Sequence, residues 1–225
     1  MNQKDIREQT VRDAKANLIL DAARKVFSDN GFHNTKLEDI AQVAGFSKAS
    51  LYNYFSDKEE IFLSLAIRDF DELLTKLRLG MKPSEPVLTS IEYLLRTVFT
   101  FFGEQFAFLW ETANYQMCQN FNAPHLVKQH QELVKTFHGH FVELVDTFTV
   151  MLGEARKRGE IKSTVNEATL SRFIASLARG VVFEWKMRGK MGDVEETVMN
   201  LLAFITSGLG HIVVTDNRAE IRSIA

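Results

Sequence analysis

The chain has 225 residues, 45% of them hydrophobic and 25% charged, which is the composition of a globular protein with a core. The formal charge of −2 argues against nucleic-acid binding through a uniformly basic domain. One cysteine, Cys118, excludes an internal disulfide and a cysteine zinc site. The polar N-terminus is unlike a signal peptide, and the lack of a long apolar run predicts no membrane span and no membrane partner, so we expect a cytoplasmic protein.

The first predicted helix runs from about residue 11 to residue 29, after a polar stretch (1–10) that we expect to be frayed. Its apolar residues have the spacing of a helix with one buried face, and Asn30-Gly31 ends it. Thr35 is placed to cap a second helix, with Glu38 three residues later completing a capping box.

Residues 36–55 have the pattern of two short helices joined by a tight turn. Ala41 lets the helices cross closely, Gly45 tolerates a left-handed backbone in the turn, and Leu51 pins the second helix from behind. The pattern predicts a helix-turn-helix whose second helix enters the DNA major groove. A helical hairpin that binds nothing would show the same spacing and remains an alternative.

The outer face of the second helix carries small and polar residues, and Ser47 is placed to cap it. Lys48 suits guanine or a phosphate, Asn53 suits adenine or the backbone, and Ala49 suits a thymine methyl group. Ser50 shares this face. We therefore expect these side chains to read DNA.

Around this motif the sequence resembles the TetR family of bacterial transcriptional regulators, over about 50 residues. The matching residues are Ala22-Ala23, Val26-Phe27, Asn30-Gly31-Phe32, Thr35, Asp39-Ile40-Ala41, Ala44-Gly45, Ser47-Lys48, Leu51-Tyr52, Tyr54-Phe55 and Lys58-Glu59. The resemblance implies an all-α fold of about nine helices. A three-helix DNA-binding domain (1–58) would precede a larger ligand-binding and dimerisation domain (59–225).

The resemblance also implies phosphate contacts by residues around the motif. Tyr52 and Tyr54 stand where family members commonly hydrogen-bond phosphates, although packing would equally explain Tyr54. Thr35 and Lys36 begin a helix whose free N–H groups attract phosphate. Many family members have Ser or Thr where this chain has Lys36, and a lysine contact has a less fixed geometry. Lys58 is expected to clamp a phosphate, the alternative being a solvated charge.

Long helices dominate the rest of the chain. Ser56 and Glu59 form a predicted capping box for a helix that ends near Leu79, about 34 Å long and able to act as a lever. The segment from Gly80 to Pro86 interrupts the helical pattern. Further helices are predicted over 85–103, 105–121, 124–158, 166–189 and 193–214.

The chain contains 18 phenylalanines, which pack with gaps more readily than leucines do and favour a cavity between helices. The resemblance implies a small-molecule inducer in this domain, and the residues suggest an apolar or aromatic one. The candidate ligand residues are Phe70, Phe99, Phe102, Phe106, Trp110, Tyr115, Phe137, His138, Phe141, Phe173 and Leu177. The alternative is a plain aromatic core.

The last two predicted helices are apolar over more than one narrow face, so they are either buried in a core or shared with a partner. Two helices from each of two subunits would form a four-helix interface with two-fold symmetry. The candidate interface residues are Phe173, Leu177, Val181, Trp185, Val198, Leu201, Leu202, Ile205 and Leu209. A monomer core is the alternative.

No catalytic motif accompanies these features. The six histidines are scattered, and no HExxH, GxSxG or glycine-rich phosphate loop occurs, so we expect no enzyme, no metal and no cofactor. The resemblance implies a homodimeric repressor in the bacterial cytoplasm, associated with the nucleoid. It would bind a pseudo-palindromic operator in double-stranded DNA until an inducer releases it. A helical ligand or haem sensor and a protein-interaction adaptor are the competing interpretations.

Overall fold

The computed structural model describes residues 2–82, 84–112 and 129–207, without the side chains of residues 104–112 and of Lys186. Every regular element in these ranges is a helix, which confirms the all-α class; eight helices are described, against about nine predicted. In chain order they are α1 (Gln3–Asn34), α2 (Leu37–Ala44), α3 (Lys48–Leu51), α4 (Lys58–Gly80), α5 (Val87–Thr112), α8 (Gln131–Lys157), α9 (Glu167–Met187) and α10 (Val194–Ser207). Among the helices described, none combines the length and the hydropathy that a membrane-spanning segment requires.

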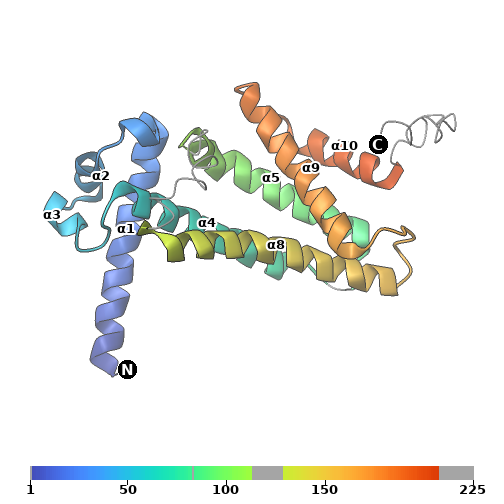
Figure 1. Ribbon diagram of the computed structural model, residues 1–225, viewed down its shortest axis with the longest axis horizontal. Coiled ribbons are helices and arrows are strands. Elements are labelled where there is room, and N and C mark those ends of the chain that lie inside the picture. The colour runs from blue at the N-terminus through green and yellow to red at the C-terminus, as the bar shows by residue number, and fades with distance from the viewer. Residues whose placement is uncertain (1, 83, 113–128, 208–225) are drawn as a thin grey trace.

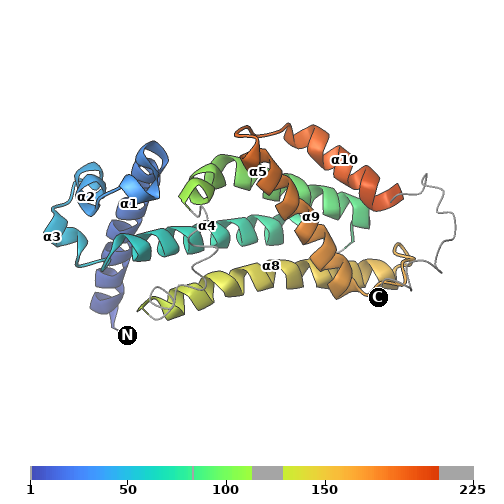
Figure 2. The same ribbon diagram turned by 45° about the horizontal axis from the view of Figure 1, so that its top comes forward.

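The helices form an elongated molecule with a small head at one end. Figure 1 shows α1, α2 and α3 gathered in this head, and α4 leading away from it beside α8. Helix α5 packs against α1 and α4, while α9 lies across α8 and α5 (Figure 2). Helix α10 packs along α5. The long α4 therefore touches both the head and the helical bundle.

One apolar core extends through both parts of the molecule without a break. In the head, Phe62 of α4 packs edge-to-face against Phe27 and Phe32 of α1, at centroid distances of 6.2 and 5.3 Å. Two turns further along α4, Phe70 packs against the bundle. The first turns of α4 thus complete the core of the head, and the later turns belong to the bundle.

The N-terminal end of α1 differs from the prediction. The Asn2 side chain accepts hydrogen bonds of 2.9 Å from the backbone N–H groups of Lys4 and Asp5, so the helix starts at Gln3. The prediction of a frayed segment was therefore wrong for residues 3–10. At the other end the backbone leaves the helical region at Gly31, where φ is 73°, and a last turn continues to Asn34.

The predicted cap of α2 was also wrong. The residue that caps α2 is Lys36, whose backbone N–H donates to the Asp39 carboxylate at 3.0 Å. Thr35 is buried instead, and its hydroxyl donates to the carbonyl of Gly31 at 2.8 Å. The Thr35 hydroxyl therefore donates to a carbonyl group of the preceding turn and does not accept from the N–H groups of α2. The local sequence pattern alone does not show this partner.

The cap of α4 lies one residue beyond the predicted Ser56–Glu59 box. Asp57 is the N-cap and accepts from the Glu60 N–H at 2.7 Å, while Glu60 reaches back to the Ser56 N–H at 2.6 Å. The helix ends at Gly80, as predicted within one residue.

Two boundaries in the bundle needed correction. Helix α5 runs through the expected break near residue 104 and ends at Thr112. Helix α8 begins at Gln131, seven residues later than the predicted start, and 113–128 lie outside the described residues. The predicted end of the last helix, at 214, also lies outside them.

Candidate DNA-reading surface and ligand domain

The turn between α2 and α3 has the geometry that its sequence predicts. Gly45 adopts φ 73° and ψ 26°, a left-handed conformation that glycine reaches without strain. Ala41 and Leu51 are buried on either side of it. The Ser47 hydroxyl accepts from the Ser50 N–H at 3.1 Å, which confirms the predicted cap of α3. This local frame fixes α3 against the head.

The side chains expected to read DNA lie on the free surface of the head. Lys48, Ala49, Tyr52 and Asn53 are exposed, and Ser50 is half-buried with its hydroxyl 2.8 Å from that of Ser47. Helix α3 is short, so Tyr52 and Asn53 follow it in the turn beyond Leu51. The surface is small and polar, as a helix that enters a groove requires.

Tyr54 is half-buried at the end of this surface. Its ring packs edge-to-face on Phe46 at 6.1 Å, and the Arg12 guanidinium lies 5.7 Å from its centroid. Arg12 also donates to the backbone carbonyl of Asn53 at 3.1 Å. Arg12 was missed in the sequence because it precedes Asn53 by 41 residues and belongs to no motif. Arg12 thus ties the exposed part of α1 to the turn that follows α3.

Lys48 is held between two side chains at the start of α3. Its ammonium group forms an ion pair with Glu38 of α2, and it lies 5.9 Å from the centroid of the Tyr52 ring. The hydrogen bond between them lowers the pKa of the Glu38 carboxyl and raises that of Lys48. Both side chains remain about half exposed, so the pair lies on the surface of the head.

The structure places Lys58 in a different role from the predicted phosphate clamp. Its ammonium group donates to the carbonyl oxygens of Phe32, His33 and Thr35 at 2.8, 3.1 and 3.1 Å. It also lies 4.6 Å from the centroid of the Phe32 ring. An ammonium has three donors, so this arrangement uses all of them within the protein.

Of the predicted phosphate contacts near α2, Lys36 is exposed, whereas Thr35 is only 2% exposed.

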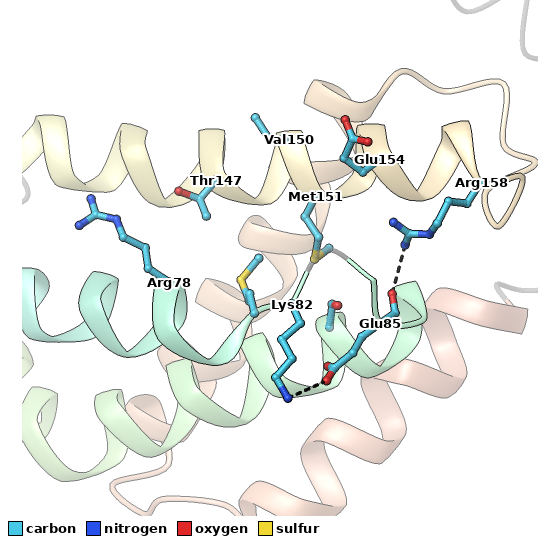
Figure 3. Close-up of a pocket in the computed structure, with 10 residues that line it drawn as sticks. Arg78, Lys82, Glu85, Thr147, Val150, Met151, Glu154 and Arg158 are labelled. Carbon is cyan, nitrogen blue, oxygen red and sulfur yellow. Dashed lines mark hydrogen bonds and ion pairs between the residues drawn. The ribbon is translucent and has the colours of Figure 1, made fainter.

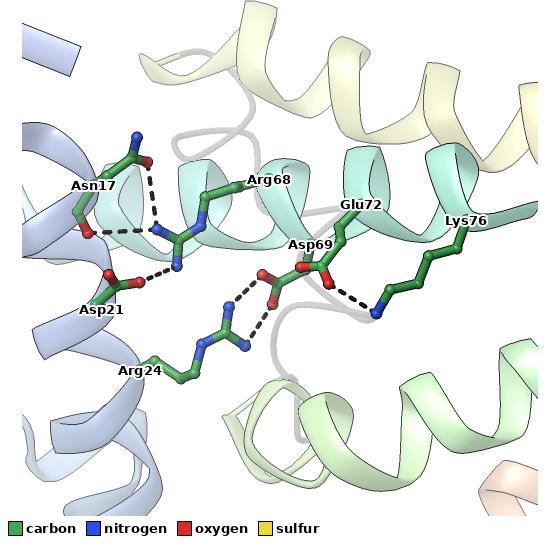
Figure 4. Close-up of polar contacts among 7 residues, drawn as sticks. All are labelled: Asn17, Asp21, Arg24, Arg68, Asp69, Glu72 and Lys76. Atoms are coloured by element: carbon green, nitrogen blue, oxygen red, sulfur yellow. Dashed lines mark hydrogen bonds and ion pairs between the residues drawn. The ribbon is translucent and has the colours of Figure 1, made fainter. Parts of the chain in front are cut away.

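A polar network joins the head to the long helix α4 (Figure 4). Arg24 of α1 makes two hydrogen bonds to the carboxylate of Asp69, which is 1% exposed. One turn away on α1, Asp21 accepts from Arg68 at 2.8 Å. Burial raises the pKa of Asp69, and the Arg24 guanidinium opposes that shift. Two ion pairs thus fix α4 against α1 where it leaves the head.

The described aromatic side chains form a packed cluster between α4, α5 and α8. Phe70 is 3% exposed and makes edge-to-face contacts with Phe101, Phe102 and Phe137 at 5.3–6.4 Å. Phe99 lies elsewhere in the core, 5.4 Å from Trp185 of α9. The structure therefore separates the predicted ligand residues into different neighbourhoods.

The other predicted ligand residues lie outside this cluster or outside the description. His138 and Phe141 are exposed on α8. Phe173 and Leu177 are 58% and 36% exposed on α9. The side chains of Phe106 and Trp110, and the whole of Tyr115, lie outside the described residues.

A pocket of about 240 Å³ lies at the end of α4 that is remote from the head (Figure 3). Its lining comes from the end of α4, the following loop, α5 and α8, and comprises Arg78, Met81, Lys82, Glu85, Ser90, Thr147, Val150, Met151, Glu154 and Arg158. Two basic side chains of this lining bind Glu85: Arg158 donates to the Glu85 carbonyl at 3.1 Å, and Lys82 pairs with the Glu85 carboxylate at 3.5 Å. Sequence reasoning missed this pocket because its residues come from separate helices.

The predicted interface helices expose a set of large apolar side chains. On α9 and α10 these are Phe173, Leu177, Phe183, Met187, Met199 and Phe204. Val181, Trp185, Leu201, Leu202 and Ile205 are half-buried, and Leu209 lies outside the described residues. Val198 is fully buried within the subunit, so its predicted place at an interface was wrong.

The helix-turn-helix and its exposed face define a class of DNA-binding transcriptional regulators. Residues 19–65 match the family model of bacterial regulatory proteins of the tetR family. This match covers α2, α3 and the parts of α1 and α4 that pack on them, and it confirms the resemblance to the TetR family seen in the sequence.

Relatives extend the likeness beyond the head. The chain is 26% identical to the HTH-type transcriptional regulator UidR of Escherichia coli over 77% of its length and 83% of the relative's. It is 38% identical to RutR of the same species over 36% of this chain and 38% of that one. Its fold is similar to that of a transcriptional regulator FadR from Bacillus subtilis in complex with stearoyl-CoA. The TM-score there is 0.65 and the identity 21%, over 85% of this chain and 97% of that chain.

Proposed function

We propose that the protein is a homodimeric, non-enzymatic repressor that acts at the bacterial nucleoid. It binds a pseudo-palindromic operator in double-stranded DNA and is released by a small ligand. The observation that carries this proposal is the exposed polar face of α3, held against a buried core by the Gly45 turn and the Ser47 cap. An adaptor that binds proteins would be expected to expose apolar side chains on that face.

The apolar faces of α9 and α10 support pairing of two copies. Their exposed side chains include Phe173 at 58% and Phe204 at 44%, and a two-fold axis would place the same residues opposite one another. Two heads would then reach successive major grooves, one helical turn of DNA or a multiple of it apart.

The ligand is proposed to act in the helical domain through α4. The aromatic cluster around Phe70 contacts the middle of α4, and the pocket at Met81 contacts its far end. A ligand that rearranges either region would tilt α4 and change the spacing of the two heads. Operator affinity would then fall, because only the conformation with the correct spacing fits both half-sites. The similar fold that binds stearoyl-CoA supports a ligand with a large apolar part.

The experiment that tests this function is DNA selection from a random duplex pool at a fixed salt concentration, followed by titration of the enriched duplex. We expect an inverted repeat bound by two subunits. Binding that is weak, salt-sensitive and indifferent to sequence would contradict the proposal. Mass spectrometry of the purified protein for a bound apolar compound controls for a sample already locked in its ligand-bound state.

A further inference from the structure

Glu38 is a carboxylate on a surface that the proposed function brings against DNA. It belongs to the first turn of α2, and its side chain is 53% exposed beside the start of the recognition helix α3. Phosphates repel a carboxylate, so Glu38 lowers the affinity for DNA of any sequence. Glu38 forms an ion pair with Lys48, a side chain expected to read bases. This position indicates that Glu38 offsets the loss of affinity by helping to select the DNA sequence.

The Lys48–Glu38 pair presents a donor and an acceptor side by side. Lys48 is the first residue of α3, and residues at the start of a recognition helix contact base edges. The ion pair on one side and the Tyr52 ring on the other restrict where its ammonium group lies. The two groups therefore act as one unit with a defined order, ammonium next to carboxylate.

The major-groove edge of a G·C pair offers the complementary order. Guanine presents the O6 acceptor and cytosine the N4 amino donor. These two atoms are Watson–Crick partners, so they are hydrogen-bonded neighbours about 3 Å apart. The Lys48 ammonium and the Glu38 carboxylate are likewise hydrogen-bonded to each other. Lysine suits guanine O6, and glutamate suits cytosine N4.

We propose that Glu38 is a specificity-determining residue: together with Lys48 it recognises one G·C pair in each half-site. Lys48 donates to guanine O6, and Glu38 accepts from the cytosine N4 amino group. This inference rests on the proposed DNA-binding function and adds to it a residue outside the recognition helix.

The test compares wild type, Glu38→Ala, Lys48→Ala and the double variant on the duplex that wild type selects. The G·C pair whose preference Lys48→Ala weakens defines the position. We expect replacing that G·C pair by A·T to weaken wild-type binding on the order of 10-fold. The change should have a smaller effect on Glu38→Ala and on Lys48→Ala, which each keep one of the two contacts, and little effect on the double variant. Asp29→Ala removes an equal charge from an exposed part of the head and should keep the full preference.

A chemical probe isolates the contact of Glu38. N4-methylcytosine at that pair keeps Watson–Crick pairing but places a methyl group where the amino hydrogen faces the groove. Wild type should lose affinity on the order of 10-fold on this duplex, whereas Glu38→Ala should bind both duplexes alike. If Glu38→Ala keeps the wild-type preference and the wild-type sensitivity to methylation, the inference fails while the repressor function stands. If wild type selects no sequence at all, the proposed function itself fails.

Discussion

Lys58 shows how one side chain can take a structural role at a position that suggests a contact with DNA. Its three hydrogen bonds satisfy carbonyl groups at the end of α1, Phe32 and His33, and at Thr35 just beyond it. A cation at a helix C-terminus also interacts favourably with the helix dipole. Lys58 therefore joins the end of α1 to the start of α4 inside the head.

The variant Lys58→Met keeps the apolar stem and removes the ammonium group. We expect the free energy of unfolding to fall by roughly 1–3 kcal/mol, because carbonyl groups lose charged donors. Urea denaturation measures this loss, and Lys25→Met, an exposed lysine on α1, is the matched control. The salt dependence of operator binding should not change. A slope reduced by about 1 would show instead that Lys58 neutralises a phosphate.

Single residues of the head differ in how far the sequence could predict them. Gly45 and Ser47 behave as expected because their roles depend on the backbone within three residues. Thr35 and Lys58 do not, because their partners depend on how α1 ends and on where α4 begins. Glu38 was assigned to a cap, and only the folded turn brings it to Lys48.

At the scale of elements, the joint between α1 and α4 depends on a buried ion pair. Asp69 is 1% exposed, and two hydrogen bonds from Arg24 compensate the cost of burying its charge. Removing only Arg24 would leave a buried carboxylate without its guanidinium. Replacing both residues by apolar ones would avoid that penalty.

We therefore expect Arg24→Met to lower the free energy of unfolding by about 3 kcal/mol at neutral pH, near the low end for a broken buried pair because Arg24 is partly exposed. Burial already raises the pKa of Asp69, and losing Arg24 raises it further. The folded protein then holds a proton that the unfolded chain releases. The variant should be relatively stable below the ordinary pKa of aspartate and should lose stability as the pH rises through the raised value.

Denaturation across acidic to neutral pH measures this effect. The double variant Arg24→Met/Asp69→Leu is the control, and its stability should not show the added pH dependence. A loss in Arg24→Met that is the same at every pH would contradict the role assigned to the Asp69 charge.

The order and type of the helices followed from periodicity and from caps, whereas their packing partners did not. The apolar spacing in α1 predicts its buried face correctly. The break expected near residue 104 is absent, and α5 continues through Gly103 as one helix. The run of aromatic residues predicted a region rich in aromatic contacts. Only the packing of the helices shows that Phe70 lies against Phe137, whereas Phe99 lies against Trp185.

At the scale of the whole molecule, the exposed faces of α9 and α10 predict the oligomeric state. Phe173→Asp places a charge in the proposed interface and should weaken dimerisation by about 2 kcal/mol or more, roughly 30-fold in the dissociation constant. Sedimentation equilibrium measures the change, and operator affinity should fall with it. Leu79→Asp, on an exposed residue of α4, is the control. A Phe173→Asp dimer as tight as wild type would place the interface elsewhere.

The length of α4 sets a mechanical scale for the molecule. Its 23 residues span about 34 Å, from the Asp57 cap in the head to the edge of the pocket beside Met81. A rotation of about 5° about the pocket end moves the other end by about 3 Å, close to the 3.4 Å rise of one base pair. In the proposed mechanism, a ligand would therefore need only a small angular change at one end of α4 to shift the head by one step along DNA.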